Sequence, residues 1–237
     1  MRLDKFLADM GCGTRSDLKK MIRKGCAQVD GQIARDPGMA VTEESRIEFD
    51  NVRIVYQTKV YIMMNKPAGV ISATDDPRQK TVIDLITERT RHDLFPVGRL
   101  DKDTEGLLLL TNDGLLAHRL LSPRHHVDKT YYAELDGEVT EEMIRLFAEG
   151  LDVEDEEPFK ALPARLTGAE EKHAQNGALI TIQEGKYHQV KRMFKMTGRE
   201  VLYLKRLSMG TLKLDESLKA GEWRYLTEAE IQTLRGI

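Results

Sequence analysis

The chain has 237 residues, of which 41 % are hydrophobic and 32 % charged, and its formal net charge is −3. This length favours one large domain or a small domain joined to a larger one. No apolar run approaches the roughly 20 residues that span a bilayer, and the first residues lack the apolar segment of a secretion signal. With only two cysteines, a disulfide framework is excluded. We therefore expect a cytoplasmic protein without membrane contact, in which any polyanion-binding surface is local.

The first 35 residues are basic, with eight lysines and arginines against four aspartates. Apolar residues at helical spacing predict a helix over 3–10, and Thr14 followed by Asp17 predicts the start of a second helix. The second helix gathers five cations on the side opposite its apolar residues, namely Arg15, Lys19, Lys20, Arg23 and Lys24. This density favours a phosphate-binding face over an ordinary solvated one. After it, Asp30-Gly31 predicts the tight turn of a hairpin.

Residues 51–59 have the composition of a linker, so we expect a basic head with its linker over 1–58 and a larger domain over 59–237. In the larger domain, helices are predicted over 81–90, 115–121, 141–149 and 190–196. Strands are predicted over 60–64, 106–111, 130–135, 178–183, 201–207 and 222–226. This mixture predicts an α+β fold, with a largely antiparallel mixed sheet flanked by helices.

A second basic segment lies between residues 184 and 213, where eight lysines and arginines oppose two glutamates. Phosphate neutralisation is the use that such a segment suggests. The chain lacks a glycine-rich nucleotide loop, a histidine pair at metal-binding spacing and a serine nucleophile elbow. We therefore expect neither a metal nor a cofactor.

The segment GRLDKDTEGLLLLTNDG, residues 98–114, is an acidic loop that runs into an apolar strand. It resembles the signature of the RsuA/RluB/RluE/RluF family of ribosomal RNA pseudouridine synthases. Three further segments match that family in the same order: NKPAGVIS at 65–72, KTY at 129–131 and EGKYHQVKRMF at 184–194. In the head, RLDKFLADMG, GTRSDLKKMIRKG and VDG resemble an S4 RNA-binding domain over roughly residues 1–50. The resemblance thus implies a pseudouridine synthase fold behind an S4 head.

The resemblance also implies roles for individual residues. Asp101 matches the catalytic nucleophile, Tyr131 the aromatic that stacks on the target base and assists proton transfer, and Lys191 the cation that pairs with the aspartate. Many relatives carry arginine at the position of Lys191, and lysine offers a point charge without the guanidinium fork. Arg99 matches the residue that fills the space left by a flipped nucleotide. Further RNA contacts are expected from Lys129 of the KTY segment and from Lys186 and Arg192 of the second basic segment.

The implied reaction breaks the N1–C1′ bond of uridine, rotates the uracil and joins C5 to C1′, without redox change or net hydrolysis, so no cofactor is needed. A glycoside hydrolase remains an alternative, with Asp103 or Glu105 as its second carboxylate. A non-catalytic S4 protein that binds ribosomes is another.

Within the family, the S4 head and an end soon after the Trp223 strand resemble the members that act on 16S ribosomal RNA, although a 23S enzyme stays open. The expected partner is ribosomal RNA or a small-subunit assembly intermediate, bound by a monomer.

Overall fold

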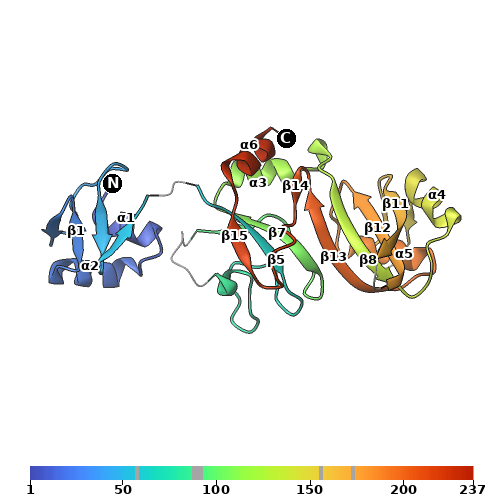
Figure 1. Ribbon diagram of the computed structural model, residues 1–237, viewed down its shortest axis with the longest axis horizontal. Coiled ribbons are helices and arrows are strands. Elements are labelled where there is room, and N and C mark those ends of the chain that lie inside the picture. Colours follow the sequence, from blue (N-terminus) through green and yellow to red (C-terminus); the bar gives the residue numbers. More distant parts are fainter. Residues whose placement is uncertain (57–58, 87–92, 155–156, 172–173, 237) are drawn as a thin grey trace. The chain divides into compact units, whose positions relative to one another are not determined.

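The computed structural model describes residues 1–56, 59–86, 93–154, 157–171 and 174–236. The chain divides into two compact units, a smaller one formed chiefly by Met1–Val60 and a larger one formed by Tyr61–Ile86 and Phe95–Ile237. Each unit has its own hydrophobic core, and each is described here by itself (Figure 1).

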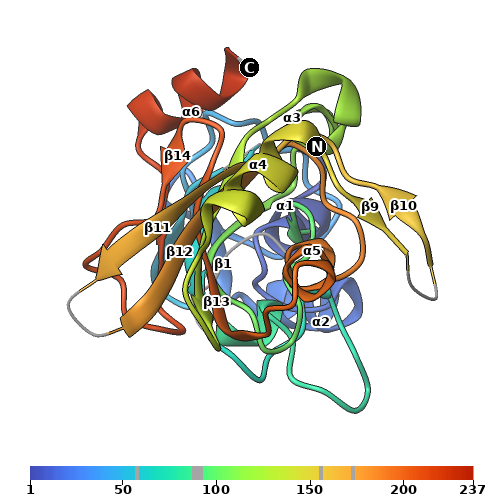
Figure 2. The ribbon, with the colours of Figure 1, turned by 90° about the vertical axis from the view of Figure 1, so that its right-hand side faces the viewer.

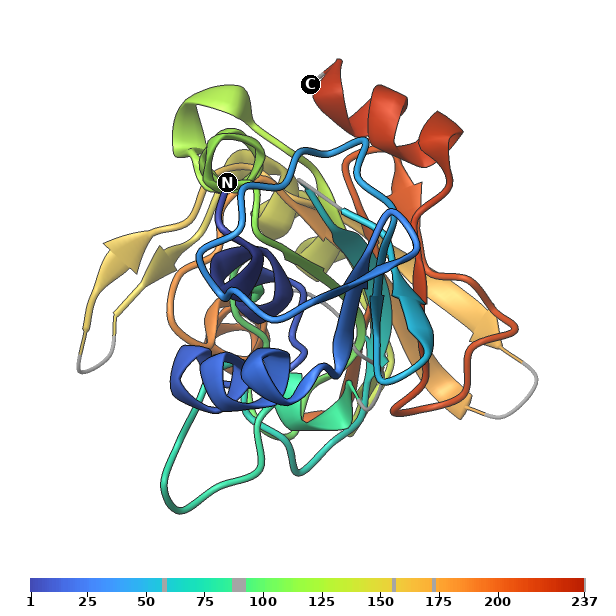
Figure 3. The same ribbon diagram turned by 90° about the vertical axis from the view of Figure 1, so that its left-hand side faces the viewer.

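The smaller unit packs two helices on a four-stranded antiparallel sheet (Figure 3). Its elements are α1 (Leu3–Asp9), α2 (Arg15–Lys24), β1 (Ala27–Val29), β2 (Gln32–Ala34), β3 (Ile47–Phe49) and β4 (Val52–Ile54), with the strand order β2-β1-β3-β4. Both predicted helices are confirmed, and the Thr14 hydroxyl accepts from the amide of Asp17 at 3.2 Å at the start of α2. The predicted turn is also confirmed, because Asp30 and Gly31 have φ 51° and 82°, as a type I′ hairpin requires.

The predicted linker is wrong over Val52–Ile54. These residues form β4, which pairs with β3 in the register Ile47↔Ile54. The turn between the two strands is Asp50-Asn51, and both residues have positive φ, 51° and 63°. An Asp-Asn pair tolerates this backbone, so the polar pair marks a second hairpin turn. Residues 57 and 58 of the predicted linker lie outside the described residues.

Among the described residues of the larger unit, nine strands form one sheet with the order β11-β12-β8-β13-β7-β5-β15, to which β14 adds on β13 and β6 on β7. The bounds are β5 (Tyr61–Lys66), β6 (Phe95–Pro96), β7 (Glu105–Thr111), β8 (Lys129–Leu135), β11 (Arg165–Glu171), β12 (Ala174–Ile182), β13 (Val201–Met209), β14 (Leu212–Lys213) and β15 (Trp223–Tyr225). Only β13 and β7 pair in parallel in the described sheet. The predicted α+β class with a largely antiparallel sheet is confirmed.

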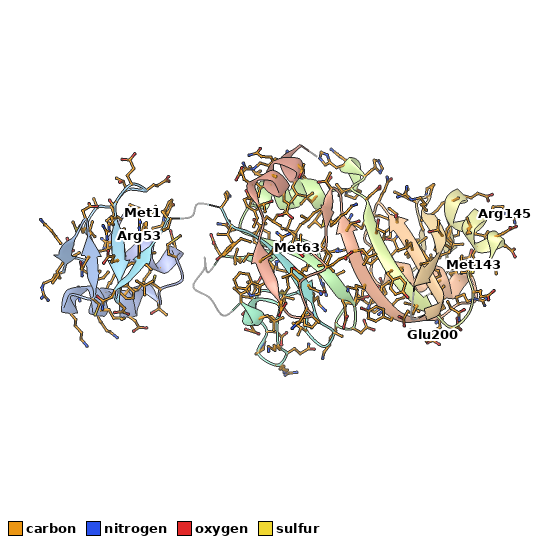
Figure 4. The ribbon with its side chains drawn as sticks, in the orientation of Figure 1. Met1, Arg53, Met63, Met143, Arg145 and Glu200 are labelled. Carbon is orange, nitrogen blue, oxygen red and sulfur yellow. The ribbon has the colours of Figure 1, made fainter. Side chains whose placement is uncertain are left out.

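Helices lie near both ends of this sheet. Figure 1 shows α3 (Gly114–Leu121) beside α6 (Glu228–Arg235), with α4 (Glu141–Glu149) and α5 (Gln189–Met196) at the other end of the sheet, the end that faces the viewer in Figure 2. Leu116, Leu120 and Leu234 bury their side chains in one core cluster with Met63, which Figure 4 labels. A short hairpin of β9 (Asp152–Val153) and β10 (Phe159–Lys160) follows α4. No helix in the described part of the chain is long and apolar enough to cross a membrane.

The helix predicted over 81–90 is wrong in its described part. Only a 3₁₀ turn forms there, at Ile83–Leu85. The Asp84 carboxylate accepts from the amide and the hydroxyl of Thr81, at 2.8 and 3.0 Å, and the chain is extended again at Ile86. These local bonds close a turn in place of a helix. Residues 87–90 lie outside the described residues, and neither β11 nor α6 was predicted.

Candidate active site

A buried lysine binds the loop that carries Asp101 through hydrogen bonds to its main chain. Lys66, the last residue of β5, is fully buried, and its Nζ lies 2.8–3.3 Å from the carbonyl oxygens of Pro67, Asp101, Lys102 and Thr104. Burial lowers the pKa of Lys66 to about 8. Because one ammonium group gathers these carbonyls, the backbone around Asp101 is fixed to the end of β5.

A serine fixes the residue before Asp101. The Ser72 hydroxyl donates to the carbonyl of Leu100 at 2.9 Å and accepts from the Leu100 amide at 3.0 Å. The amide of Gly69 bonds the carbonyl of Lys102 at 2.7 Å. Bonds on both sides of Asp101 thus restrict where its carboxylate can point.

The start of α5 brings two more side chains to Asp101. His188, the residue before α5, has φ 48°, a left-handed backbone that is uncommon outside glycine. Its Nε2 lies 3.6 Å from one Asp101 carboxylate oxygen, and Lys191 Nζ lies 3.7 Å from the other. Lys191 is closer to Asp103, at 2.6 and 2.7 Å from its two oxygens. The hydrogen bond from Lys191 lowers the pKa of Asp103.

Asp101, His188 and Lys191 border one hollow of about 60 Å³. It is lined by five of the residues singled out from the sequence: Arg99, Asp101, Tyr131, Lys186 and Lys191. They come from four places in the sequence, since Arg99 and Asp101 share a loop, Tyr131 is on β8, Lys186 precedes α5 and Lys191 is within it. Tyr131 is 7 % exposed, so its ring forms part of the wall. This juxtaposition offers a carboxylate, a cation and an aromatic ring to one small ligand group.

Burial removes Lys129 from the predicted set of RNA contacts. Only 6 % of Lys129 is exposed, and its ammonium donates to the carbonyl of Val127 at 3.1 Å. Burial, reinforced by the nearby charge of Arg206, lowers the pKa of Lys129 to about 8. A side chain enclosed in this way has no access to phosphate groups.

Lys186 and Arg192 hold the β9–β10 hairpin in place. The Lys186 ammonium lies 4.3 Å from the ring centre of Phe159, and the Arg192 guanidinium 4.7 Å from the same ring. Lys186 also donates to the carbonyl of Lys160 at 3.1 Å, and Arg192 to the carbonyls of Tyr187 and Glu157. Their positive charges border the site, but their side chains are already engaged within the protein.

Asp4, a carboxylate with no exposed surface, pairs with part of the cationic face predicted on α2. Arg2 at 3.1 Å, Arg15 at 3.4 Å and Lys19 at 4.0 Å surround it. The hydrogen bond from Arg2 lowers the pKa of Asp4. Arg15 and Lys19 therefore balance an internal charge, and the exposed cations farther along α2 are Lys20, Arg23 and Lys24.

Lys66 and His188 also belong to this site, although neither was predicted to have a role there. For Lys66 the signal was a lysine at the end of an apolar strand, because a charge there needs internal partners. For His188 the only signal was its place in the EGKYHQVKRMF segment.

Two protein-family models match this chain. A model described as RNA pseudouridylate synthase matches residues 60–196, and a model of the S4 domain matches residues 1–47. An "Uncharacterized RNA pseudouridine synthase YtzG" of Bacillus subtilis is 48 % identical over 99 % of this chain and 98 % of its own. A protein of Pseudomonas aeruginosa named "Ribosomal small subunit pseudouridine synthase A" is 43 % identical over 98 % of this chain and 99 % of its own.

Among solved structures, a crystal structure of a pseudouridylate synthase superposes with a TM-score of 0.68 at 38 % identity. The match covers 99 % of both chains.

Proposed function

We propose that this chain, which belongs to the RNA pseudouridine synthase family and within it to the RsuA type, isomerises a specific uridine of 16S ribosomal RNA. The choice of the small subunit is supported by relatives named ribosomal small subunit pseudouridine synthase A, at 41 % identity in Vibrio vulnificus and 43 % in Pseudomonas aeruginosa. The substrate is naked 16S RNA or an assembly intermediate, bound by a monomer in the cytoplasm.

One observation carries the proposal: the Asp101 carboxylate lines the same small hollow as Tyr131 and Lys191. Its side chain is 28 % exposed, so it is neither freely solvated nor sealed from a substrate. The Lys191 ammonium at 3.7 Å and the His188 ring at 3.6 Å lie on opposite oxygens of the carboxylate. This arrangement suits an anion that must act on an electron-poor sugar carbon in a partly desolvated site.

In the reaction we propose, the target uridine leaves its stack and its uracil lies against Tyr131. Asp101 attacks C1′ as the N1–C1′ bond breaks, and the bonding electrons pass to the uracil. The uracil turns so that C5 faces C1′. The C5–C1′ bond then forms as the carboxylate departs with its electrons, the proton on C5 is lost and N1 gains one. Atoms and charge balance without water or a cofactor.

The alternative of a glycoside hydrolase needs a second carboxyl group that protonates the leaving group, and such an acid has a raised pKa. The pKa of Asp103 is instead lowered by its bond to Lys191. Glu105 accepts from the hydroxyl of Tyr203 at 2.8 Å and from the amide of Ala68 at 3.4 Å, so its carboxylate has a structural use. Both facts favour the synthase over the hydrolase.

Asp101→Asn tests the proposal. The amide keeps the size of the side chain and removes the anion, so we expect loss of turnover with RNA binding retained. Turnover is measured as tritium release from 16S RNA labelled at C5 of uridine, with free uracil assayed in parallel. Tritium release by Asp101→Asn near the wild-type rate, or stoichiometric uracil from the wild type, contradicts the mechanism.

Asp152→Asn is the matched control, since Asp152 is exposed on β9 and does not line the hollow. It should keep wild-type turnover. Mapping pseudouridines in ribosomal RNA from cells with and without the gene decides the subunit. A missing pseudouridine in 23S RNA with 16S RNA unchanged contradicts the small-subunit assignment and leaves the chemistry intact.

A further inference from the structure

Tyr187 presents an aromatic ring to solvent beside the hollow of Asp101. The residue is 64 % exposed, and its ring stacks on the imidazole of His188 with the ring centres 3.8 Å apart and the planes at 21°. The stack covers one face of the tyrosine ring, and the exposed fraction leaves the other face open. Proteins that bind single-stranded RNA use open aromatic faces of this kind to stack nucleobases.

Hydrogen bonds fix the main chain that carries this ring. Arg192 donates to the carbonyl of Tyr187 at 3.1 Å, and the Gln189 side chain accepts from the amide of Lys186 at 2.9 Å. His188 has the left-handed φ of 48° noted above, a conformation that persists only where the surroundings determine it. Because the main chain that carries the stack is fixed, a base that joins the stack orders little additional backbone.

One member of the stack, His188, lies where two hollows meet. His188 and Lys191 line both the hollow of Asp101 and a second hollow of about 580 Å³. The wall of the second hollow has three further cations, Arg192, Lys195 and Arg199, and two acids, Asp136 and Glu200, so with Lys191 its positive charges outnumber the negative ones. An RNA strand that leaves the hollow of Asp101 along this wall brings its phosphates close to positive charge.

We propose that the Tyr187–His188 stack receives the nucleobase adjacent to the target uridine, with the backbone of that nucleotide over the second hollow. The inference rests on the proposed function, because it requires a uridine flipped toward Asp101. Flipping takes a stacking partner away from the neighbouring base, and Tyr187 supplies a new one. Since every base has a stacking face, this site holds the strand without selecting the identity of the neighbour.

The test uses the full chain and the ribosomal RNA segment in which it forms pseudouridine. The segment is synthesised in two forms, with 2-aminopurine on the 5′ or the 3′ side of the target uridine, because stacking quenches the fluorescence of this base. We expect one of the two positions to be quenched by the wild type and by Tyr187→Phe, but not by Tyr187→Leu. Tyr187→Leu should also weaken RNA binding by about five- to hundredfold, the loss that one base stack represents.

Tyr225→Leu is the matched control, since Tyr225 is 38 % exposed on β15 and its ring packs on Trp223, which lines neither hollow, whereas Tyr187 stacks on His188, which lines both. It should quench as the wild type does. Tritium release is measured on the same proteins. Two results overturn the proposed role of the Tyr187–His188 stack alone. One is quenching that survives Tyr187→Leu, and the other is a wild type that releases tritium but quenches at neither position. A wild type that releases no tritium from any ribosomal RNA overturns the proposed function, and with it the proposed role of the Tyr187–His188 stack.

Discussion

At the scale of single residues, Lys191 divides its charge between two carboxylates. Its ammonium is 2.6 Å from Asp103 and 3.7 Å from Asp101. The side chain of Asp103 is 73 % exposed, and an ion pair that water reaches so freely contributes little free energy, about 0–1 kcal/mol. The pair with Asp103 therefore adds little to stability, and it leaves the Lys191 ammonium within 3.7 Å of the Asp101 carboxylate.

We expect Lys191→Met to reduce turnover about a hundredfold, because it removes a positive charge beside the reacting carboxylate. RNA affinity should change by less than about threefold, since one cation among several is lost. Lys195→Met is the comparison on the same helix: Lys195 is exposed and lines the second hollow but not the hollow of Asp101, so its loss should affect RNA affinity more than turnover. Turnover and affinity are measured separately for each variant, and equal effects from the two substitutions contradict the pairing.

Asp103→Asn completes this comparison. If Asp103 only positions Lys191, turnover should fall by less than about fivefold, the equivalent of an exposed ion pair. A loss as large as that of Asp101→Asn would instead make Asp103 part of the chemistry.

At the scale of elements, α6 is fastened to β15 through one arginine. Arg224 on β15 donates to Asp215 at 2.6 Å and to both oxygens of Glu230 on α6, at 2.8 and 2.9 Å. Glu230 also accepts from the amide of Thr227, whose hydroxyl accepts from the Glu230 amide, so the same carboxylate completes a capping box. Its bonds with Arg224 lower the pKa of Glu230 to about 2.

We expect Glu230→Gln to lower the free energy of unfolding at pH 7 by about 1–2 kcal/mol, as charged hydrogen bonds are lost. The folded pKa lies below the ordinary value of roughly 4.3, so the stabilisation is present above that pH and disappears as the pH falls toward 2. The difference between wild type and variant should therefore shrink over this range.

Urea unfolding at pH 7 and pH 3 measures the effect. Glu228→Gln is the matched control in the same first turn of α6, and it should change stability less at pH 7. A Glu230→Gln difference that is independent of pH would assign the loss to packing.

At the scale of the whole molecule, a net charge of −3 conceals separate basic regions in the two units. In the smaller unit, part of the positive charge stabilises the fold, because it pairs with the buried Asp4. Removing these partners leaves a buried negative charge unbalanced. The exposed cations at the end of α2, Arg23 and Lys24, are not among the ion-pair partners of Asp4.

We expect the pair Arg23→Gln and Lys24→Gln to weaken RNA binding and to flatten its salt dependence by up to about one unit of slope per lost phosphate contact. Stability should be unaffected. The companion pair Arg15→Gln and Lys19→Gln should lower the stability of the smaller unit, because two partners of Asp4 are lost. RNA affinity against salt concentration and urea unfolding are measured for both pairs, and an unchanged salt slope for the first contradicts an RNA contact there.

Elements that rest on local interactions could be predicted from the amino-acid order alone. The apolar spacing of α2, its Thr14 cap and the Asp30-Gly31 turn each depend on residues a few positions apart, so they could be predicted. The residues that line the hollow of Asp101 could be named from motif segments, although their roles stay proposals. Predictions were wrong at Val52–Ile54 and near Thr81, where Asp-Asn and Thr-Asp pairs close turns that composition alone does not distinguish from a linker or a helix start.

The pairing of charges, in contrast, follows from the three-dimensional fold. Lys191 and Asp103 are 88 positions apart, and Lys66 and Thr104 are 38 apart. Whether a lysine reaches a phosphate, a carboxylate or a set of carbonyls depends on which groups the fold places within about 3–4 Å of its ammonium. A lysine in a motif has the same letter whether it is buried, as Lys129 is, or exposed, as Lys195 is. Electrostatic partners are set by distance in space and by exclusion of water, and neither quantity is local in sequence.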